Sequence, residues 1–316
     1  MKKDILQKVV LACISSPMSY KYLCDNFQIY QQELNDIVKY LEERGCEWLH
    51  KDTTLQLKYP MEWLDVDMLR SNVTSTLHYF SEVESTNSFL LDHRELLKQG
   101  DICIAEYQNK PRAQRNKGWT APYGSQLAFS MYWSFEPKHV ISGLSLTVGL
   151  ALLETLRSFD IDDLAAKWPN DIYRDGEKLA GILTECSTGA SGKIDVVIGI
   201  GINLYEFSSK TDINQPVATL SDLMKQRINK TILAQALWVN LSSYLKNFEK
   251  YGFAYFQNKW LESDIFMNKP VEVIKDDIRI FALHKGVDPS GYLLLEIDGA
   301  VVRHASSNVS LRLAVD

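Results

Sequence analysis

Several common signatures are missing from this 316-residue sequence, and each absence excludes a class of protein. The five cysteines form no CxxC pair, and the six histidines show neither HxxxH nor HExxH spacing, so we expect no metal site built by the protein. Scattered cysteines also indicate reduced thiols, as in a cytosol. The formal net charge of −6 removes the overall basic character that nucleic-acid binders usually show.

Long uninterrupted apolar runs are also missing. The most apolar stretch, at 140–156, is broken by Ser142, Ser145 and Thr147, which makes it too short and too interrupted to cross a bilayer. The N-terminus MKKDILQKVV carries two lysines but lacks the apolar core and the small-residue cleavage site of a secretion signal. We therefore expect a soluble, cytoplasmic protein with no membrane partner.

The pattern of apolar and turn residues divides the chain into three expected domains of an α+β protein. Residues 1–64 predict three helices and a small hairpin, which is typical of a winged helix-turn-helix. Residues 65–265 mix strands and helices around one sheet, including a helix expected from Thr86 to Gly100. From 266 to 316, short strands separated by turns predict a small SH3-like β-barrel.

A basic segment follows the strand predicted at DICIAEYQ. Residues 108–124 read QNKPRAQRNKGWTAPYG and hold four cations within eight residues, with no acidic residue among them. These cations are Lys110, Arg112, Arg115 and Lys117. In an acidic protein, such a cluster is either a solvated loop or a loop that closes over an anion.

Three further motifs place polar or small residues beside apolar strands. KWPND at 167–171 is either a solvated turn or part of a site. EKLAGILTE at 177–185 favours the site, because Lys178 precedes small residues that let a ligand lie against the strand near an ammonium group. GIGIN at 199–203 lacks the third glycine of a dinucleotide site, and its glycines indicate close backbone packing, which also suits a sheet lined by a ligand.

Taken in chain order, ESTN, AEYQ with the basic loop, WTAPYG, KWPND, KLAGIL, GIGIN and a terminal SLR resemble the biotin protein ligases, specifically the bifunctional ligase/repressor type. The resemblance covers essentially the whole chain and implies a class II synthetase-like mixed sheet between the winged helix and the barrel. It also implies a two-step reaction. Biotin is activated with ATP to biotinyl-5′-AMP, and a lysine of a biotin carboxyl carrier domain then attacks the mixed anhydride.

The same resemblance implies the ligands and partners. ATP and biotin are the implied substrates, with Mg²⁺ bound through the ATP phosphates. The carrier protein of a biotin-dependent carboxylase is the implied partner. A homodimer and operator DNA are further partners that the resemblance allows.

Site residues follow from the resemblance position by position. The catalytic residues would be Lys178, Arg112 and Arg115. The biotin-binding residues would be Ser85, Thr86, Asn87, Gln108, Arg112, Gly181 and Gly201. The adenylate would be bound by Lys117, Trp119, Asn170, Lys178, Asn203 and Arg312. For Trp119, which the resemblance places beside adenine, an ordinary core anchor is the alternative interpretation.

The basic loop departs from the family pattern GRGRRGRxW, since it reads PRAQRNKGW from Pro111 to Trp119. Three glycines have become Pro111, Ala113 and Asn116, and the middle arginine has become Gln114. Proline removes a backbone donor and alanine narrows the allowed φ, so we expect a stiffer and less charged loop. We hypothesise a less effective lid, with leakage of adenylate, slower turnover or both, and loss of activity as the extreme case.

The first 64 residues leave two interpretations open. The third predicted helix begins with Gln31 and Gln32, contains no arginine at its exposed start and offers only Lys39 farther on. Residues 1–64 contain eight Lys or Arg and nine Asp or Glu, so the phosphate-neutralising contribution to DNA binding is small. The domain is either an operator binder or a vestigial winged helix packed on the ligase core.

Two alternative functions remain for the whole chain. A lipoate or octanoyl ligase-like transferase would share the catalytic fold, although the KWPND and KLAGIL pair argues against it. A biotin-sensing regulator with impaired ligase activity is suggested by the altered loop, and the retained Arg112, Asn170 and Lys178 argue against it.

Overall fold

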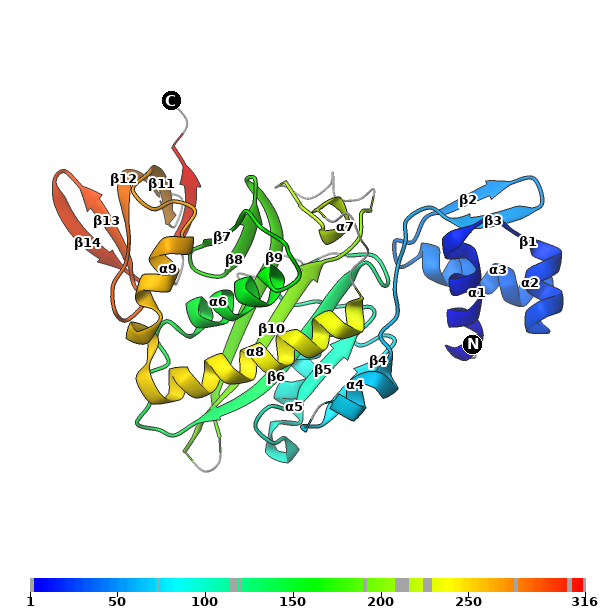
Figure 1. Cartoon of the computed structure of the whole chain (residues 1–316), viewed down its shortest axis with the longest axis horizontal. Coiled ribbons are helices and arrows are strands. Elements are labelled where there is room, and N and C mark those ends of the chain that lie inside the picture. Colours follow the sequence, from blue (N-terminus) through cyan, green and yellow to red (C-terminus); the bar gives the residue numbers. More distant parts are fainter. Residues whose placement is uncertain are drawn as a thin grey trace.

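The structure is a computed structural model that describes residues 3–72, 74–113, 119, 121–189, 192–207, 216–223, 229–275, 278–305 and 309–314. Figure 1 shows three parts in a row: a small N-terminal part, a central sheet with its helices, and a C-terminal group of strands. Among the described residues, no helix is both long and apolar enough to cross a membrane.

The N-terminal part, called the head here (3–57), combines helices with a short sheet. Its elements are α1 (Lys3–Ser15), α2 (Tyr20–Phe27), α3 (Gln31–Glu42), β1 (Met18–Ser19), β2 (Trp48–Lys51) and β3 (Thr54–Leu57). Helix α3 buries Leu34, Ile37, Val38 and Leu41, whose spacing forms one helical face. The predicted three helices and hairpin are thus present, and the short strand β1 pairs with β3 to extend the hairpin.

The central sheet has seven strands in the order β4-β5-β6-β10-β9-β8-β7. Its strands are β4 (Leu77–Phe80), β5 (Ile102–Ala105), β6 (Gln126–Phe135), β7 (Leu164–Lys167), β8 (Asp171–Arg174), β9 (Glu177–Thr188) and β10 (Ile194–Asn203). Strands β4 and β5 pair in parallel and the other neighbours are antiparallel, so the sheet is mixed, as the family resemblance implies.

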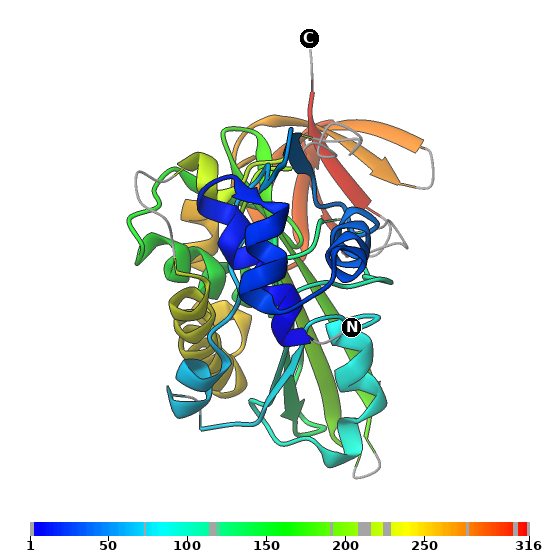
Figure 2. The same ribbon diagram turned by 90° about the vertical axis from the view of Figure 1, so that its right-hand side faces the viewer.

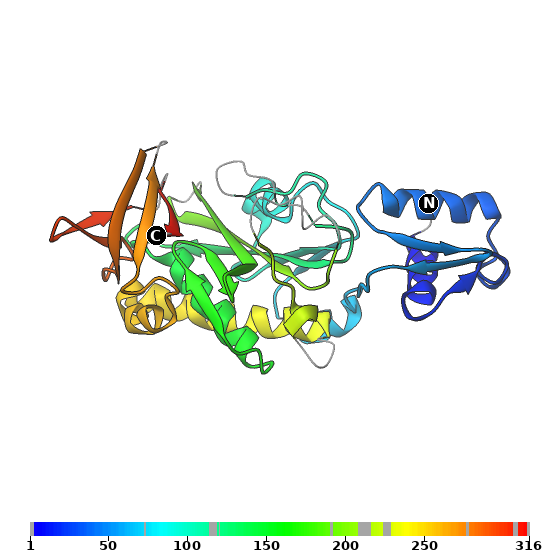
Figure 3. The ribbon, with the colours of Figure 1, turned by 90° about the horizontal axis from the view of Figure 1, so that it is seen from above.

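Helices cover both faces of this sheet. The apolar stretch at 140–156 supplies α6 (Leu144–Arg157), which packs beside the long helix α8 (Lys230–Tyr251) on one face (Figure 1). Helix α5 (Thr86–Asp92) lies on the other face, as the view from above shows (Figure 3). The shorter helical pieces are α4 (Val66–Asn72), η1 (Arg94–Leu96), α7 (Leu220–Leu223), η4 (Phe253–Tyr255) and α9 (Gln257–Ser263).

The helix predicted from Thr86 to Gly100 is shorter than expected. Helix α5 ends at Asp92, and His93 leaves the helical conformation while its backbone N–H still donates to the carbonyl of Phe89. The single 3-10 turn η1 follows, and Gly100 then takes a positive φ of 89° before β5. Glycine suits that backbone conformation, so Gly100 starts the return into the sheet instead of ending a helix.

The C-terminal strands form a five-stranded antiparallel sheet in the order β14-β13-β12-β11-β15. Its strands are β11 (Pro270–Lys275), β12 (Ile278–Val287), β13 (Leu293–Ile297), β14 (Ala300–His304) and β15 (Val309–Leu313). A buried contact between Asp264 and His284 (2.6 Å) fastens this sheet to the segment after α9. Antiparallel strands agree with the sequence, while closure into an SH3-like barrel stays a prediction.

A few side chains at the junction connect the head to the central part; Figure 2 views the molecule from the head's end. Tyr123, in the loop before β6, is 1% exposed and belongs to the head's hydrophobic cluster, where its ring lies 5.8 Å from that of Trp63. Arg44, just after α3, pairs with Glu82 of the central part at 2.9 Å. Burial and the hydrogen bond to Glu82 raise the pKa of Tyr40 to about 12, which keeps its hydroxyl a neutral donor.

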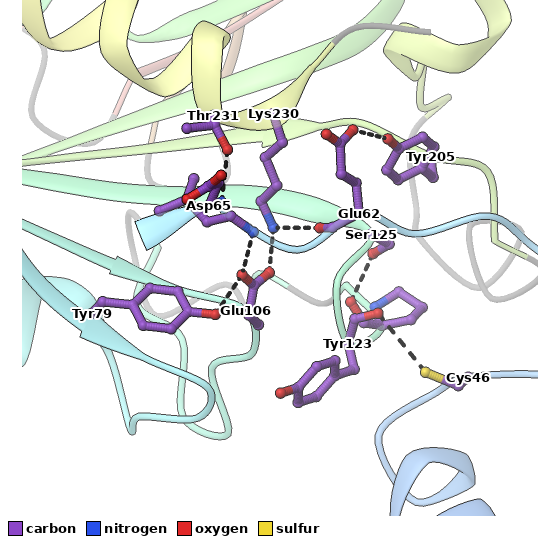
Figure 4. A network of polar contacts seen from close by, with 12 residues as sticks. Cys46, Glu62, Asp65, Tyr79, Glu106, Tyr123, Ser125, Tyr205, Lys230 and Thr231 are labelled. Atoms are coloured by element: carbon purple, nitrogen blue, oxygen red, sulfur yellow. Dashed lines mark hydrogen bonds and ion pairs between the residues drawn. The ribbon is translucent and has the colours of Figure 1, made fainter. Parts of the chain in front are cut away.

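A buried ion pair lies beneath the connection between the two parts (Figure 4). Lys230 and Glu106 are both 0% exposed, and their Nζ and Oε2 atoms are 2.5 Å apart. The other oxygen of Glu106 accepts hydrogen bonds from the backbone N–H of Leu64 (3.0 Å) and the hydroxyl of Tyr79 (2.8 Å). Lys230 also approaches the carbonyl of Glu62 at 3.4 Å, so this network holds the connecting segment on the central part.

Candidate active site

A pocket with a cavity volume of about 210 Å³ lies on the central sheet. Its walls come from the start of α5, the loop after β5, the β7–β8 turn, the inner strands β6, β9 and β10, and the last strand β15. Most of the predicted site residues therefore meet in one place, although they are spread over the sequence from residue 85 to residue 201. The sheet order causes this, because β9 lies between β10 and β8.

The ESTN turn forms a buried polar corner of the pocket. Ser85 caps α5 by accepting a hydrogen bond from the N–H of Ser88 (3.4 Å). Gln108 reaches this turn, since its Oε1 accepts from both the backbone N–H (2.8 Å) and the hydroxyl (3.1 Å) of Thr86. Ser130 of β6 lies 2.7 Å from the same hydroxyl. Ser85, Thr86 and Gln108 are thus brought together, as predicted, with side chains of both donor and acceptor character.

Three glycines leave the surface of the sheet free of side chains, so that other groups can approach its backbone closely. A Cβ on Gly181 or Gly201 would come within 2.9 or 2.8 Å of the Trp119 ring, closer than real contacts allow. A Cβ on Gly199 would come within 2.3 Å of the side-chain oxygen of Asn87. The indole nitrogen of Trp119 donates a hydrogen bond to Gln126. The Trp119 ring therefore packs directly on the backbone of Gly181 and Gly201 at the pocket.

Lys178 points into the pocket beside an acid and an aromatic ring. Its Nζ lies 2.8 Å from Oδ1 of Asp171 and 5.4 Å from the centre of the Trp119 ring, and both members of the ion pair are mostly buried. The pairing of β8 with β9 brings Asp171 opposite Gly181, which places its carboxylate near Lys178. A cation–π contact and an ion pair hold the ammonium in place.

The two asparagines predicted for the adenylate, Asn170 and Asn203, both donate hydrogen bonds to backbone carbonyls of β9. Asn170 lines the pocket, and its side-chain amide donates to the carbonyl of Ile182 at 2.7 Å, which ties the KWPND turn to β9. Asn203 is buried and donates to the carbonyl of Lys178 at 3.3 Å, but it is not among the described residues that line the pocket. Their predicted contacts with the adenylate stay predictions.

Lys167, the first residue of KWPND, also lines the pocket. Its Nζ is 3.2 Å from the hydroxyl of Tyr173 and 4.7 Å from the centre of that ring. Burial and the charge of Asp171 raise the pKa of Tyr173, so its hydroxyl is neutral next to this cation.

Arg112 is the cation of the basic loop that the structure describes at the pocket. Its Nη2 lies 2.6 Å from Oε1 of Glu185 on β9, and the other oxygen of Glu185 accepts from the amide of Asn87 at 2.9 Å. Sequence reasoning missed Glu185. The alternation of side chains along a strand could have indicated it, because the side chains at 181, 183 and 185 point to the same side of the strand.

Three of the predicted cations are not among the described residues that line the pocket. Arg115 and Lys117 lie outside the described residues. Arg312 is exposed on β15, opposite Glu272, and is not among the described residues of the lining. Its neighbour Ser310 lines the pocket and occupies the same side of the strand, so Arg312 lies just beyond the pocket's edge. In the described part of the chain, no group of three His, Cys, Asp or Glu side chains is arranged to hold a metal ion.

Comparisons with known proteins agree with this geometry. The model of the biotin/lipoate A/B protein ligase family matches residues 79–203. The bifunctional ligase/repressor BirA of Salmonella typhimurium is 37% identical over 262 residues, which cover 82% of this chain and 81% of the relative. BirA of Escherichia coli is 39% identical over 235 residues, covering 73% of each chain.

A solved structure shows the same fold. The biotin protein ligase of Aquifex aeolicus in complex with biotin and ATP superposes with a TM-score of 0.67 at 23% identity, covering 76% of this chain and 99% of that one. Because the match to the Salmonella protein extends over most of both sequences, this chain belongs to the biotin protein ligases of the biotin/lipoate A/B protein ligase family.

Proposed function

We propose that this protein activates biotin with ATP to give biotinyl-5′-AMP and transfers the biotinyl group to a lysine of a biotin carboxyl carrier domain. The observation that carries the proposal is the single pocket in which the polar corner around Thr86, the cation Arg112 and the paired ammonium of Lys178 meet. Membership of the biotin protein ligases supports it.

The polar corner suits the ureido ring of biotin, which offers N–H donors and a carbonyl acceptor. Oε1 of Gln108 is occupied by Thr86, which leaves its amide N–H groups to donate to a ligand. Ser85 adds a buried hydroxyl at the same corner. Gly181 and Gly201 let the Trp119 ring lie close to the sheet, where the ring would form the adenine side of the pocket.

The first chemical step brings two anions together. An oxygen of the biotin carboxylate attacks the α-phosphorus of ATP, and the bond from this phosphorus to pyrophosphate breaks. Lys178 and Arg112 would balance the negative charge on the transferring group, and their fixed placement avoids reorganisation during the step. Mg²⁺ would enter with the ATP phosphates and neutralise the departing pyrophosphate.

The second step transfers the acyl group. The amine of the acceptor lysine attacks the acyl carbon, the bond from this carbon to the AMP oxygen breaks, and the amine proton passes to solvent as the amide forms. Water competes with the amine, so the basic loop would protect the anhydride by covering it. Because the loop is altered, we propose that free adenylate escapes during turnover. Measuring free adenylate against protein-bound biotin tests this, and a one-to-one coupling of the two would reject it.

The decisive experiment for the ligase is incorporation of labelled biotin into a carrier domain with ATP and Mg²⁺. Lys178→Ala should lose most of the transfer, whereas Lys193→Ala, which changes a partly exposed lysine that is not among the described residues of the pocket lining, should keep it. Lipoate offered in place of biotin should give little transfer, and preferential use of lipoate would favour the transferase alternative. A folded wild type with no transfer at all would favour the biotin-sensing regulator.

We propose operator binding as a second function, because the Salmonella and Escherichia relatives are named bifunctional ligase/repressor. Helix α3 exposes Gln31, Gln32 and Asn35, whose side chains can contact base edges. DNA would have to replace their present hydrogen bonds, such as Gln31 Nε2 to Asn35 Oδ1 at 3.0 Å. A gel shift that biotin and ATP strengthen would support repression, and no shift at low salt would leave the head a packing domain.

A homodimer formed through the edge strands of the central sheet, β4 or β7, is part of the same proposal. Sedimentation with and without biotin and ATP tests it, and a ligand-independent monomer at high concentration would exclude it.

A further inference from the structure

Glu185 is a carboxylate just beyond the described lining of the pocket, and it contacts two residues that do line it, Arg112 and Asn87. It lies on β9 on the same side of the strand as Gly181 and Leu183, which both line the pocket. Its Oε1 is 2.6 Å from Nη2 of Arg112. The Glu185 side chain is 18% exposed and that of Arg112 is 49% exposed, so the acid is the more buried partner and the arginine faces the pocket and solvent.

Asn87 of the ESTN turn also binds Glu185. The second oxygen of Glu185 accepts from the amide nitrogen of Asn87 at 2.9 Å, and Asn87 is 3% exposed. The side-chain oxygen of Asn87 is 2.6 Å from the hydroxyl of Ser130. Ser130 in turn lies 2.7 Å from the hydroxyl of Thr86. A continuous line of polar contacts therefore runs from the buried turn to the arginine of the basic loop.

This arrangement gives Asn87 a positioning role beside its predicted contact with biotin. Both ends of its amide are occupied, by Glu185 on one side and Ser130 on the other. The bare Cα of Gly199 makes room for it, since a Cβ there would come within 2.3 Å of the amide oxygen. Asn87 thus sets the position of the carboxylate, and the carboxylate sets the position of Arg112.

We propose that Glu185 is the positioning residue for Arg112: it holds one nitrogen of the guanidinium at the pocket wall and leaves the other N–H groups to bind the carboxylate of biotin. Arginine carries five N–H donors in a planar fork, and the contact with Glu185 is the one ion pair that the described residues give Arg112. A group held at one edge presents the rest of its donors in a fixed direction. The proposal rests on the proposed function, because biotin is the anion that Arg112 would meet.

Replacement of Glu185 by glutamine tests this directly. Arg112 and Asn87 contact different oxygens of Glu185, and glutamine replaces one of these oxygens by an NH2 donor, so one of the two contacts loses its acceptor and the charge attraction is lost as well. We expect the affinity for biotin to fall roughly tenfold, the effect of losing one charge-assisted hydrogen bond. The adenylate should also be released faster in the absence of acceptor. Glu185→Asp keeps the charge but shortens the side chain, so it should fall between the wild type and the glutamine variant.

A double-mutant cycle with Arg112→Ala distinguishes positioning from a general structural effect. The measured quantity is the dissociation constant of labelled biotin by equilibrium dialysis, which needs no turnover. If Glu185 acts through Arg112, then Glu185→Gln should weaken binding in the wild-type background and change little when Arg112 is already alanine. If the two losses multiply, Glu185 acts independently of Arg112 and the proposal is wrong.

The controls separate the remaining explanations. Glu136→Gln removes a carboxylate from an exposed ion pair with Lys193 and should leave biotin affinity unchanged. Unchanged biotin affinity of Glu185→Gln, in a wild type that binds biotin and forms adenylate, overturns this inference alone. A folded wild type that neither binds biotin nor forms adenylate would instead overturn the proposed function, and the inference with it.

Discussion

Replacing Lys230 by methionine removes one partner of an ion pair that is sealed from solvent. Both Lys230 and Glu106 are 0% exposed, and the remaining contacts of Glu106 come from the N–H of Leu64 and the hydroxyl of Tyr79 (Figure 4). Two neutral donors do not balance a buried negative charge. Breaking one side of such a pair costs about 3–5 kcal/mol of folding free energy, and we expect a loss of that size for Lys230→Met.

The double variant makes the prediction sharper. With Lys230→Met and Glu106→Gln together, no buried charge is left at this place, and the glutamine oxygen still accepts from Leu64 and Tyr79. Replacement of a whole buried pair by uncharged groups is often nearly neutral, so the double variant should be more stable than Lys230→Met alone. The second substitution should therefore recover stability.

Urea unfolding followed by tryptophan fluorescence measures both effects, with the free energy taken from the midpoint and the slope. Lys193→Met is the matched control, since Lys193 is 44% exposed and its partner Glu136 is 50% exposed, and its midpoint should equal that of the wild type. A loss below about 1 kcal/mol for Lys230→Met, or a double variant less stable than the single one, would refute the reasoning.

Three further predictions concern the pocket and the contact between head and centre. Gly201→Val should weaken ATP binding roughly tenfold, because a side chain at this position would collide with the Trp119 ring. Isothermal titration with ATP measures the affinity, and an unchanged affinity would contradict the close packing of Trp119 on Gly201. Tyr123→Ala should destabilise the head by about 3 kcal/mol, because it leaves a cavity where a buried aromatic ring was. Faster proteolysis between the head and the central part would show this loss of stability, and wild-type resistance to protease would contradict the prediction. Burial by itself would raise the pKa of Glu82, but the hydrogen bonds from Arg44 and Tyr40 have the larger combined effect, so the pKa of Glu82 is lowered. The stabilisation by Glu82 should thus be complete above about pH 4.3, the ordinary glutamate value, and vanish as the pH falls through its lowered pKa. The urea midpoints of Glu82→Gln and wild type should converge in acid, and a constant difference would exclude this.

Local patterns in the sequence suffice for much of the fold. The buried face of α3 follows from apolar residues at helical spacing, and α6 follows from an apolar run too short for a membrane. The short strands after residue 266 follow from their turn residues. The end of α5 could not be predicted in this way, because Gly100 serves as a strand entry whose positive φ depends on the neighbouring sheet.

The site was predictable where motifs carry it. Residues from ESTN, KWPND, KLAGIL and GIGIN line one pocket, and Lys178 stands in it beside Trp119. The acids that hold the cations were not predictable in the same way. Glu185 and Asp171 are ordinary strand residues in the sequence, and they meet Arg112 and Lys178 only after the strands pair.

The sequence by itself therefore determined the types of element and the motifs that supply polar and small residues to the pocket, because spacing and residue type act over short distances along the chain, while the mixed central sheet followed from the family resemblance. Only the tertiary structure decided which charges are partners. Glu185 with Arg112, Lys230 with Glu106, and Tyr123 within the head join residues that are far apart in sequence. Those contacts depend on strand order and domain packing, and burial then makes each unpaired charge costly, which gives these distant pairs their energetic weight.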